Sequence, residues 1–339
     1  MQAAIQQAVE RALDGLAVPA EQMEQAVGAL MDGCCSPVEI TALLVALRAK
    51  GEAVSELVGA ARAMRQRAVR IPVECSGLLD TCGTGGDRLK TFNISTAAAL
   101  VAAAAGVPVA KHGNRSVSSS SGSADVLEAL GVNIQLSPAQ VARCVEQIGL
   151  GFCFAPLFHQ ATKHVASVRR ELKFRTLFNL LGPLTNPAGA PYQLVGVNNW
   201  KNAEKIAHAL LQLGTQRSLV VCCEDALDEV GLWGRTLVFW VERGEVRSLE
   251  WTAESFGLPE CRAEELRVES PEQSAEVIRA VLAGEQGAAR DIVVANAAAA
   301  LIAAGKADSP AQAAQMAAEA IDSRHAAEKL QQLVEFTAG

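Results

Sequence analysis

Residues 1–72 show the apolar periodicity of amphipathic helices, with apolar positions three and four residues apart. Within 36–51, a Ser-Pro pair supplies a helix cap and a proline at the first helical position, and a Lys-Gly pair ends the run. Residues 54–68 repeat the apolar pattern. We therefore expect a small helical bundle. Its excess of apolar residues predicts packing against the rest of the chain or against a partner copy.

From residue 78 onward, short apolar runs typical of strands alternate with helical patterns. Strands are expected at residues 78–79, 107–110, 194–197 and 218–222, with a hairpin of 237–241 and 246–249. Helices are expected after residue 93 and at residues 124–130, 137–149, 202–213, 273–283, 289–304 and 309–334. This alternation predicts an α/β fold, in which a small all-helical domain accompanies a large domain with a central, largely parallel sheet flanked by helices.

Residues 156–190 interrupt this alternation with a helical insertion that is basic within an otherwise acidic chain. Its cationic side chains are Lys163, Arg169, Arg170, Lys173 and Arg175. Gly-Pro at 182–183 and Asn-Pro at 186–187 end the helical pattern. We expect the insertion to dock beside the N-terminal bundle.

The bulk composition argues against two kinds of partner. The 339 residues are 50% hydrophobic and 4% aromatic with a net charge of -7, so the chain offers neither a basic field nor stacking surfaces for nucleic acid. No apolar run approaches the ~20 residues that span a bilayer. The first segment carries Glu10 and Arg11 in an amphipathic helix, unlike a signal peptide. We expect no nucleic-acid partner and no membrane partner.

Nine cysteines lie scattered along the chain without a C-x-x-C spacing. The adjacent pairs at 34–35 and 222–223 cannot easily form unstrained disulfides. An odd count without a secretion signal favours reduced thiols, most of them buried as small hydrophobic side chains. The sequence therefore predicts a cytoplasmic location.

Candidate chemistry lies in residues 78–125, where two loops of small residues each precede a helix N-terminus. The first loop is Gly-Thr-Gly-Gly-Asp at 83–87, with Asn-Ile-Ser-Thr at 93–96 opening the helix behind it. The second follows the strand at 107–110, begins at Lys111 and is rich in serine. Free backbone N–H groups and the positive end of a helix form anion sites. We interpret the stretch as a phosphate-handling pocket.

Each loop also has a plain structural interpretation. The glycine loop does not satisfy the dinucleotide fingerprint, because Arg88 stands where the third glycine should be, and no Walker Gly-Lys-Ser/Thr follows. It is either a tight turn or a phosphate loop, and Lys111 at a strand end favours the second. His112 is either a core histidine with a satisfied ring or a substrate contact. Ser119 and Ser123 are either helix caps or phosphate donors.

Two charged groups elsewhere bear on the same chemistry. Asp225, Asp228 and Glu229 follow the strand expected at 218–222. They form either an exposed acidic turn or a pair of carboxylates that holds magnesium against a pyrophosphate, which the phosphate loops favour. Arg169 belongs either to a surface charge cluster or to a site for a substrate carboxylate, which arginine binds with two parallel hydrogen bonds.

Taken together, these segments resemble the anthranilate phosphoribosyltransferase family of tryptophan biosynthesis over nearly the whole chain. The matching segments are GTGGD (83–87), TFNIST (91–96), AKHGNR (110–115), SGSADVLEALGVNI (121–134), FAPLFH (154–159), HVASVRRELKFRTLFNLLGPLTNPAG (164–189), LDE (227–229), SFGL (255–258) and NAAAALIAAGKA (296–307). The related pyrimidine nucleoside phosphorylases share the fold but not this set of motifs.

The resemblance implies a helical domain of residues 1–72 plus about 166–190, and an α/β domain of residues 73–165 plus 191–339 that binds phosphoribosyl pyrophosphate. It implies transfer of the phosphoribosyl group of 5-phosphoribosyl 1-pyrophosphate to the amino group of anthranilate. The products are N-(5-phosphoribosyl)anthranilate and pyrophosphate, and the cofactor is Mg²⁺, as two ions. It further implies a homodimer joined through the helical domains, and an association with anthranilate synthase.

The resemblance also assigns site residues. Phosphoribosyl pyrophosphate would contact Gly83, Gly86, Asp87, Thr91, Asn93, Ile94, Ser95, Thr96, Lys111, Ser119 and Ser123. Anthranilate would contact Gly83, His112, Asn114, Arg169 and Pro183. One magnesium ion would lie at Ser95 and a second at Asp228 and Glu229. No general base is assigned, because the weakly basic aromatic amine already offers its lone pair.

Several positions depart from the family pattern. Arg88 follows GTGGD where a glycine is common, Cys222-Cys223 stand in place of His-Gly, Ala226 replaces a glycine before Leu-Asp-Glu, and Ser120 replaces a larger residue. These departures leave open a phosphoribosyltransferase or phosphorylase that acts on another acceptor. A non-catalytic, nucleic-acid-binding relative of the same fold is a further alternative, but it would need a basic face, which conflicts with the net charge of -7.

Overall fold

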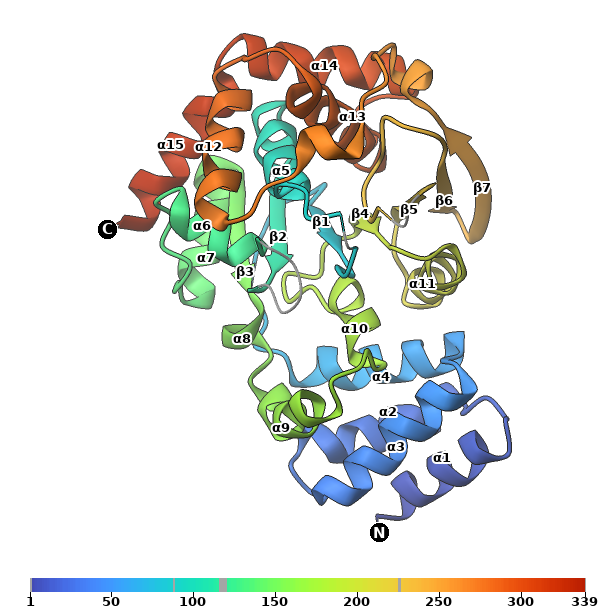
Figure 1. Cartoon of the computed structure of the whole chain (residues 1–339). Helices are drawn as coiled ribbons and strands as arrows, with labels where there is room; N and C mark the ends of the chain where they lie inside the picture. The colour runs from blue at the N-terminus through green and yellow to red at the C-terminus, as the bar shows by residue number, and fades with distance from the viewer. Residues whose placement is uncertain (1, 88, 116–120, 225–226, 339) are drawn as a thin grey trace.

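The N-terminal residues form a bundle of helices, as their periodicity predicts. The computed structural model describes residues 2–87, 89–115, 121–224 and 227–338. The bundle consists of α1 (Ala3–Leu13), α2 (Ala20–Met31), α3 (Pro37–Lys50) and α4 (Val54–Arg67), drawn in blue in Figure 1. Ser36 caps α3 as expected, because its hydroxyl accepts a hydrogen bond from the Glu39 N–H, and the Glu39 carboxylate accepts one from the Ser36 N–H.

The rest of the chain is built around one sheet. Its strands are β1 (Leu79–Gly83), β2 (Val109–Gly113), β3 (Leu150–Phe154), β4 (Tyr192–Gly196), β5 (Arg217–Cys223), β6 (Thr236–Glu242) and β7 (Glu245–Trp251). Their order is β3-β2-β1-β4-β5-β6-β7, and the first five are parallel while β6 and β7 are antiparallel. The largely parallel sheet is therefore confirmed. Because parallel strands end at one edge, the loops after β1, β2, β4 and β5 meet there.

Helices cover both faces of this sheet (Figure 1). They are α5 (Ile94–Ala104), α6 (Ser123–Ala129), α7 (Pro138–Ile148), α11 (Trp200–Gln212), α12 (Pro271–Leu282), α13 (Ala288–Ala303), α14 (Pro310–Asp322) and α15 (His325–Ala338), with short 3₁₀ turns η4 (Ala253–Phe256) and η5 (Ala263–Leu266). Successive strand residues face opposite layers. Leu219 lies in the core shared with α5 and α13, and Val220 lies in the core shared with α11.

The basic insertion docks on the bundle, as expected. It folds as α8 (Ala155–Phe158), η1 (Gln160–Thr162), α9 (Lys163–Leu172), α10 (Phe178–Leu181) and η2 (Gly182–Leu184). Helix α9 packs against α2 and α3, and α10 packs against α4. Helix α4 also packs against α11, so one apolar core continues from the bundle to the sheet. Leu13, Leu16 and Val38 stay exposed on the bundle.

Two elements differ from the sequence prediction. The strand β3 was not predicted, because its short run LGFCF follows directly on α7; Gly149 ends that helix with φ of 75°, and the strand then pairs with β2. Residues 309–334 were predicted as one helix and form two, α14 and α15. The break falls at Arg324, whose φ of 69° is left-handed, and it lets α15 pack against α5 and α7. None of the described helices is both long enough and apolar enough to cross a membrane.

Candidate active site

The glycine loop follows β1 at the carboxyl edge of the sheet. Gly85 and Gly86 have φ of 63° and 86°, a left-handed conformation that strongly favours glycine. Gly83 has little room for a side chain, because a Cβ there would lie 2.9 Å from Oδ2 of Asp228. The path of the loop therefore dictates these residue types, and the loop lies directly against the acidic pair that follows β5.

Side chains from two distant segments hold the first half of this loop. The guanidinium of Arg175 donates hydrogen bonds to the carbonyls of Thr84 at 3.0 Å and Gly85 at 2.7 Å. The Asp228 carboxylate accepts a hydrogen bond from the Gly85 N–H at 2.8 Å. The loop is thus fixed by contacts to the basic insertion and to the loop after β5.

The second half of the loop presents free amides. Asn198 donates from Nδ2 to the carbonyl of Gly86 at 2.7 Å. Within the described chain, the N–H groups of Gly86 and Asp87 have no hydrogen-bond partner. Adjacent N–H groups in a glycine turn form a concave anion site. The predicted phosphate loop therefore has the backbone geometry that its interpretation requires.

Helix α5 begins behind the glycine loop and adds its N-terminus to the same edge. Asn93 caps it, because its Oδ1 accepts a hydrogen bond from the Thr96 N–H at 3.1 Å. The Thr96 hydroxyl is buried without a partner among the described residues. Thr91 pairs with Arg267 in an isolated antiparallel bridge, which ties the chain ahead of the helix to the segment after η5. Ile94 lies buried in the first turn of α5.

Lys111 lies on β2 with its ammonium group buried between β1 and α5. Its Nζ donates to the carbonyl of Thr81 and to Oγ of Ser95, the latter at 3.1 Å. Burial lowers the pKa of Lys111, and the nearby Asp80 carboxylate opposes that shift. The structure therefore brings together Lys111 and Ser95, which the sequence placed in one pocket.

His112 is a buried, neutral histidine. Its Nδ1 lies 3.1 Å from the carbonyl of Gly182, and its ring centroid lies 5.1 Å from that of His159. Burial, together with the neighbouring His159, lowers the pKa of His112 to about 3. Its Nε2 has no partner among the described residues. The ring is therefore half satisfied, and Pro183, which follows Gly182, lies beside it.

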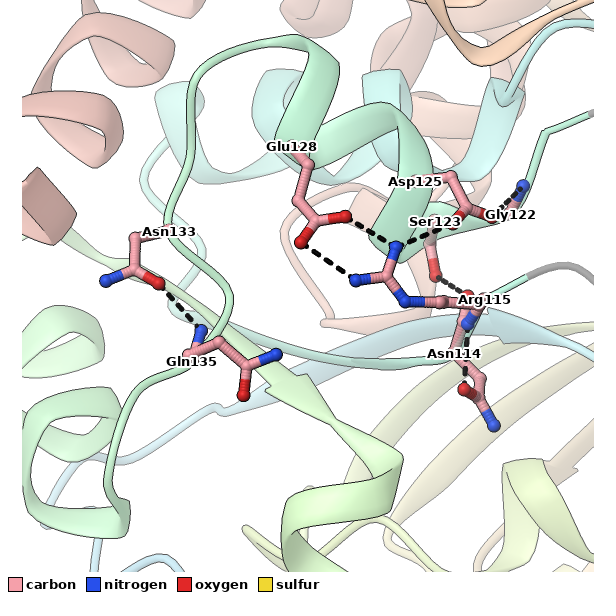
Figure 2. Close-up of polar contacts among 8 residues, drawn as sticks. All are labelled: Asn114, Arg115, Gly122, Ser123, Asp125, Glu128, Asn133 and Gln135. Carbon is pink, nitrogen blue, oxygen red and sulfur yellow. Dashed lines mark hydrogen bonds and ion pairs between the residues drawn. The ribbon is translucent and has the colours of Figure 1, made fainter.

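Asn114 and Ser123 flank the serine loop, and Figure 2 shows them at the start of α6. The Ser123 hydroxyl donates to the Asn114 carbonyl at 3.4 Å, and the Asn114 Oδ1 accepts from the Arg115 N–H at 2.8 Å. The Arg115 guanidinium donates two hydrogen bonds to Glu128 and one to Asp125. Both carboxylates lie on α6, so this cation is already paired within the protein. Ser119 lies outside the described residues.

Asp228 and Glu229 lie beside the glycine loop, as an acidic pair. Burial raises the pKa of Asp228 to about 7, reinforced by the charge of Asp87, and raises that of Glu229 to about 8, reinforced by Asp228. No three His, Cys, Asp or Glu side chains in the described ranges gather closely enough to hold a metal by themselves. Magnesium is usually held by one or two carboxylates and the substrate's phosphates, which fits this pair.

The chain just after the acidic pair is anchored from the core. Asn296, fully buried in the middle of α13, accepts a hydrogen bond from the Val230 N–H and donates one to the Val230 carbonyl, both at 2.8 Å. A buried amide that satisfies both main-chain groups of one residue fixes that residue in place. Helix α13 therefore fixes the residue that directly follows Glu229.

Arg169 lies on α9 with its guanidinium 5.2 Å from the ring centroid of Phe178. Burial lowers the pKa of Arg169. Among the described residues no carboxylate pairs with it, which disfavours the surface charge cluster. No hydrogen bond or ion pair joins Arg169 to the described parts of the two loops, so its assignment to a substrate carboxylate stays a prediction.

Comparisons with known proteins agree with this geometry. Residues 76–327 match the glycosyl transferase family a/b domain, and residues 6–68 match the glycosyl transferase family helical bundle domain. The chain is 52% identical over 334 residues to an anthranilate phosphoribosyltransferase of Thioalkalivibrio sulfidiphilus, covering 98% of this chain and 99% of that one. It belongs to the anthranilate phosphoribosyltransferase family. The resemblance drawn from the motifs is confirmed.

Solved structures of this family show the same fold. The anthranilate phosphoribosyltransferase of Thermus thermophilus superposes with a TM-score of 0.92 at 44% identity, covering 98% of this chain and 99% of that one. The anthranilate phosphoribosyltransferase of Saccharomyces cerevisiae, in complex with PRPP and Mg, superposes with a TM-score of 0.91 at 24% identity, covering 100% of this chain and 99% of that one. The expected combination of a helical and an α/β part is therefore a property of the family.

Only some of the departures from the family pattern fall among the residues that the structure describes. Cys222 and Cys223 are buried at the end of β5, and burial raises the pKa of both thiols to about 11. Buried protonated thiols act as small apolar side chains, so they fill space next to the acidic pair. Arg88, Ala226 and Ser120 lie outside the described residues.

Sequence reasoning missed three residues that shape the site of this anthranilate phosphoribosyltransferase family member. Asp80 accepts the His112 N–H at 2.9 Å. Arg175 and Asn198 hold the glycine loop. An aspartate inside an apolar strand was a usable signal for Asp80. For Asn198, the sequence offers only the presence of a polar residue shortly after a parallel strand.

Proposed function

We propose that this chain transfers the phosphoribosyl group of 5-phosphoribosyl 1-pyrophosphate to the amino group of anthranilate, giving N-(5-phosphoribosyl)anthranilate and pyrophosphate. One observation carries the proposal: the free amides of Gly86 and Asp87, the N-terminus of α5 and the Lys111 ammonium converge at one sheet edge. Such a site suits a polyphosphate. The relative at 52% identity carries the name of this activity.

In the proposed reaction the anthranilate nitrogen forms a bond to ribose C1 while the bond from C1 to pyrophosphate breaks. Pyrophosphate leaves with the electron pair, and the new ammonium loses a proton to solvent. Lys111 and the glycine-loop amides would stabilise the charge that develops on the leaving group. With its pKa lowered to about 3, His112 is neutral and would contribute hydrogen bonding rather than charge.

We further propose the residue assignments of the phosphoribosyl pyrophosphate site. The residues are Gly83, Gly86, Asp87, Thr91, Asn93, Ile94, Ser95, Thr96, Lys111, Ser119 and Ser123. The unpartnered Thr96 hydroxyl and the Lys111–Ser95 contact support the assignment at α5. Ser123 would act from the first turn of α6, where its hydroxyl reaches the Asn114 carbonyl.

Mg²⁺ is the proposed cofactor, as two ions. Ser95 would hold one of them, and Asp228 and Glu229 would hold the other. The raised pKa values of the two carboxyl groups mark a pair whose burial and repulsion a cation would relieve. When bound, the ions would neutralise the pyrophosphate. That a yeast member of the family was solved in complex with PRPP and Mg agrees with this choice.

The experiment that tests the function follows anthranilate fluorescence in a mixture of purified protein, phosphoribosyl pyrophosphate and Mg²⁺. We expect fluorescence to fall as the amine is ribosylated, and to stay constant when either phosphoribosyl pyrophosphate or the metal is omitted. Constant fluorescence at every Mg²⁺ concentration would overturn the proposal. Release of pyrophosphate with another amine or base, but not with anthranilate, would favour the alternative acceptor that Cys222-Cys223 leaves open.

The proposed anthranilate site consists of Gly83, His112, Asn114, Arg169 and Pro183. Arg169→Ala is expected to raise the KM for anthranilate by about 10-fold or more, because a charge-assisted hydrogen bond contributes about 1.5–3 kcal/mol. The KM for phosphoribosyl pyrophosphate should change far less. Steady-state kinetics with each substrate varied in turn measures both constants.

Arg170→Ala is the matched control, since Arg170 is the exposed neighbour of Arg169 on α9. It should leave both KM values unchanged. If Arg169→Ala raised the two KM values equally, the acceptor site would have to be placed elsewhere.

We propose that the chain forms a homodimer through the helical domain, residues 1–72 plus about 166–190, beside an α/β domain of 73–165 plus 191–339. The exposed Leu13, Leu16 and Val38 on the bundle support this face. Sedimentation at the mass of one 35.6 kDa chain would argue against it.

We also propose an association with anthranilate synthase, which co-sedimentation tests. We further propose a cytoplasmic location, which cell fractionation tests. The nine free thiols support a reducing compartment.

A further inference from the structure

Arg175 links the basic insertion to the glycine loop across a long stretch of sequence. It lies between α9 and α10, both of which pack against helices of the N-terminal bundle. Its two terminal nitrogens reach the consecutive carbonyls of Thr84, at 3.0 Å, and Gly85, at 2.7 Å. Burial lowers the pKa of Arg175, and the charge of Asp228 opposes that shift. The guanidinium therefore remains a cation held next to the anion site.

The glycine loop is shaped around this guanidinium. A Cβ on Gly86 would collide with Nη1 of Arg175, so the absence of a side chain at Gly86 lets the arginine approach. A planar fork with several N–H groups donates to two neighbouring carbonyls in a fixed geometry, which lysine's compact ammonium matches less well. The pairing of Arg175 with this loop is thus specific for the residue type on both sides.

The contacts of Arg175 and Asn198 determine which polar groups of the glycine loop remain free. The carbonyls of Thr84 and Gly85 accept hydrogen bonds from Arg175 and that of Gly86 accepts one from Asn198, so these three carbonyls are committed to protein donors. The N–H groups of Gly86 and Asp87 stay free within the described chain. Carbonyl oxygens would repel a phosphate, whereas free N–H groups attract it.

We propose that Arg175 is a positioning residue of the phosphoribosyl pyrophosphate site. By holding the carbonyls of Thr84 and Gly85, it orients the amides of Gly86 and Asp87 toward the pyrophosphate, and it ties that loop to the segment docked on the helical bundle. This inference rests on the proposed function for the identity of the ligand. In the structure Arg175 contacts the loop through the backbone, because each of its terminal nitrogens donates to one of the two carbonyls.

Arg175→Gln tests the proposal by isothermal calorimetry with phosphoribosyl pyrophosphate and Mg²⁺, and by steady-state kinetics. We expect binding of phosphoribosyl pyrophosphate to weaken by about 10-fold or more, since small misplacement of binding groups has effects of up to about 100-fold. The KM for anthranilate should change by less than about 3-fold, since a single loop is displaced. Arg175→Lys should recover part of the loss. Arg170→Gln, on the exposed face of α9, is the matched control.

A double-variant cycle separates positioning from direct contact. If Arg175 and Asn198 both act by orienting one loop, Arg175→Gln combined with Asn198→Ala should weaken binding by less than the product of the single effects. Independent, multiplicative effects would overturn the positioning role, as would unchanged affinity in Arg175→Gln. If that variant unfolds, Arg175→Lys is measured alone, and wild-type affinity there would contradict the need for a fork.

The same measurements keep the two proposals apart. Calorimetry requires no acceptor, so the Arg175 test stands even when anthranilate is not consumed. Wild-type protein that binds phosphoribosyl pyrophosphate but leaves anthranilate fluorescence constant would remove the proposed acceptor and not the role of Arg175. Wild-type protein that fails to bind phosphoribosyl pyrophosphate at all would overturn both.

Discussion

Lys111→Met is expected to lower kcat/KM for phosphoribosyl pyrophosphate by about 10²–10³-fold, the usual effect of removing one preorganised group that stabilises developing charge. Lys111 lies on β2 and is 3% exposed, and its ammonium contacts Ser95 in the first turn of α5. Methionine preserves most of the length and removes the charge. Steady-state kinetics gives the ratio, and calorimetry shows how much of it is ground-state binding.

Lys111→Met also leaves the carbonyl of Thr81 without its donor, which costs about 1–3 kcal/mol for a buried acceptor. Thermal unfolding must therefore be recorded on the same sample. Lys306→Met, an exposed lysine just after α13, is the control and should retain full activity. A folded Lys111→Met protein with wild-type kcat/KM would show that the pyrophosphate lies elsewhere.

The double variant Asp228→Asn with Glu229→Gln replaces the acidic pair by amides. We expect it to lower activity by about 100-fold or more and to weaken the dependence of activity on Mg²⁺. The reason is that carboxylate ligands neutralise the charge of the metal ion, whereas amides do not. Titrating Mg²⁺ in the fluorescence assay measures both effects. Asp308→Asn, an exposed position before α14, is the control for loss of a carboxylate away from the site. A double variant that still responds to Mg²⁺ like the wild type would remove these residues from the metal site.

The same double variant should be more stable than the wild type in the absence of metal at alkaline pH. In the folded chain the pKa values of Asp228 and Glu229 are raised from 3.8 and 4.5 to about 7 and about 8. Between the ordinary pKa of each group and its raised pKa in the folded chain, the unfolded chain binds fewer protons than the folded one. The free energy of unfolding therefore falls as pH rises through this range. Well below pH 3.8 both carboxyl groups are protonated in both states, and this penalty vanishes. Thermal unfolding of both proteins from pH 5 to pH 9 checks the sign.

Local patterns predicted the backbone structure wherever that structure depends on neighbouring residues. The glycine loop and the Asn93 cap each combine a strand end, small residues and a helix start, and the structure shows the expected free amides and capping contact. The helices of the bundle follow equally from apolar spacing. These features depend on contacts within a few residues, which periodicity and turn chemistry describe well.

Features that depend on distant contacts were not predictable in this way. Arg175 and Thr84 are 91 residues apart, and no local pattern distinguishes that arginine from the other cations of the insertion. The break at Arg324 interrupts an alanine-rich run whose apolar positions continue without a gap. The direction of the chain after this break depends on the helices that α15 packs against. Such long-range contacts are visible only in the tertiary structure.

The anchoring of Val230 by Asn296 connects the acidic pair to the buried core helix α13. Helix α13 lies in the alanine-rich core, where amide protons exchange with solvent only when a cooperative unit opens. Because Asn296 connects that helix to the segment bearing the two carboxylates, binding of the proposed cation there would stabilise the closed state of both by mass action. Deuterium uptake along α13 would thus report occupancy of the proposed metal site.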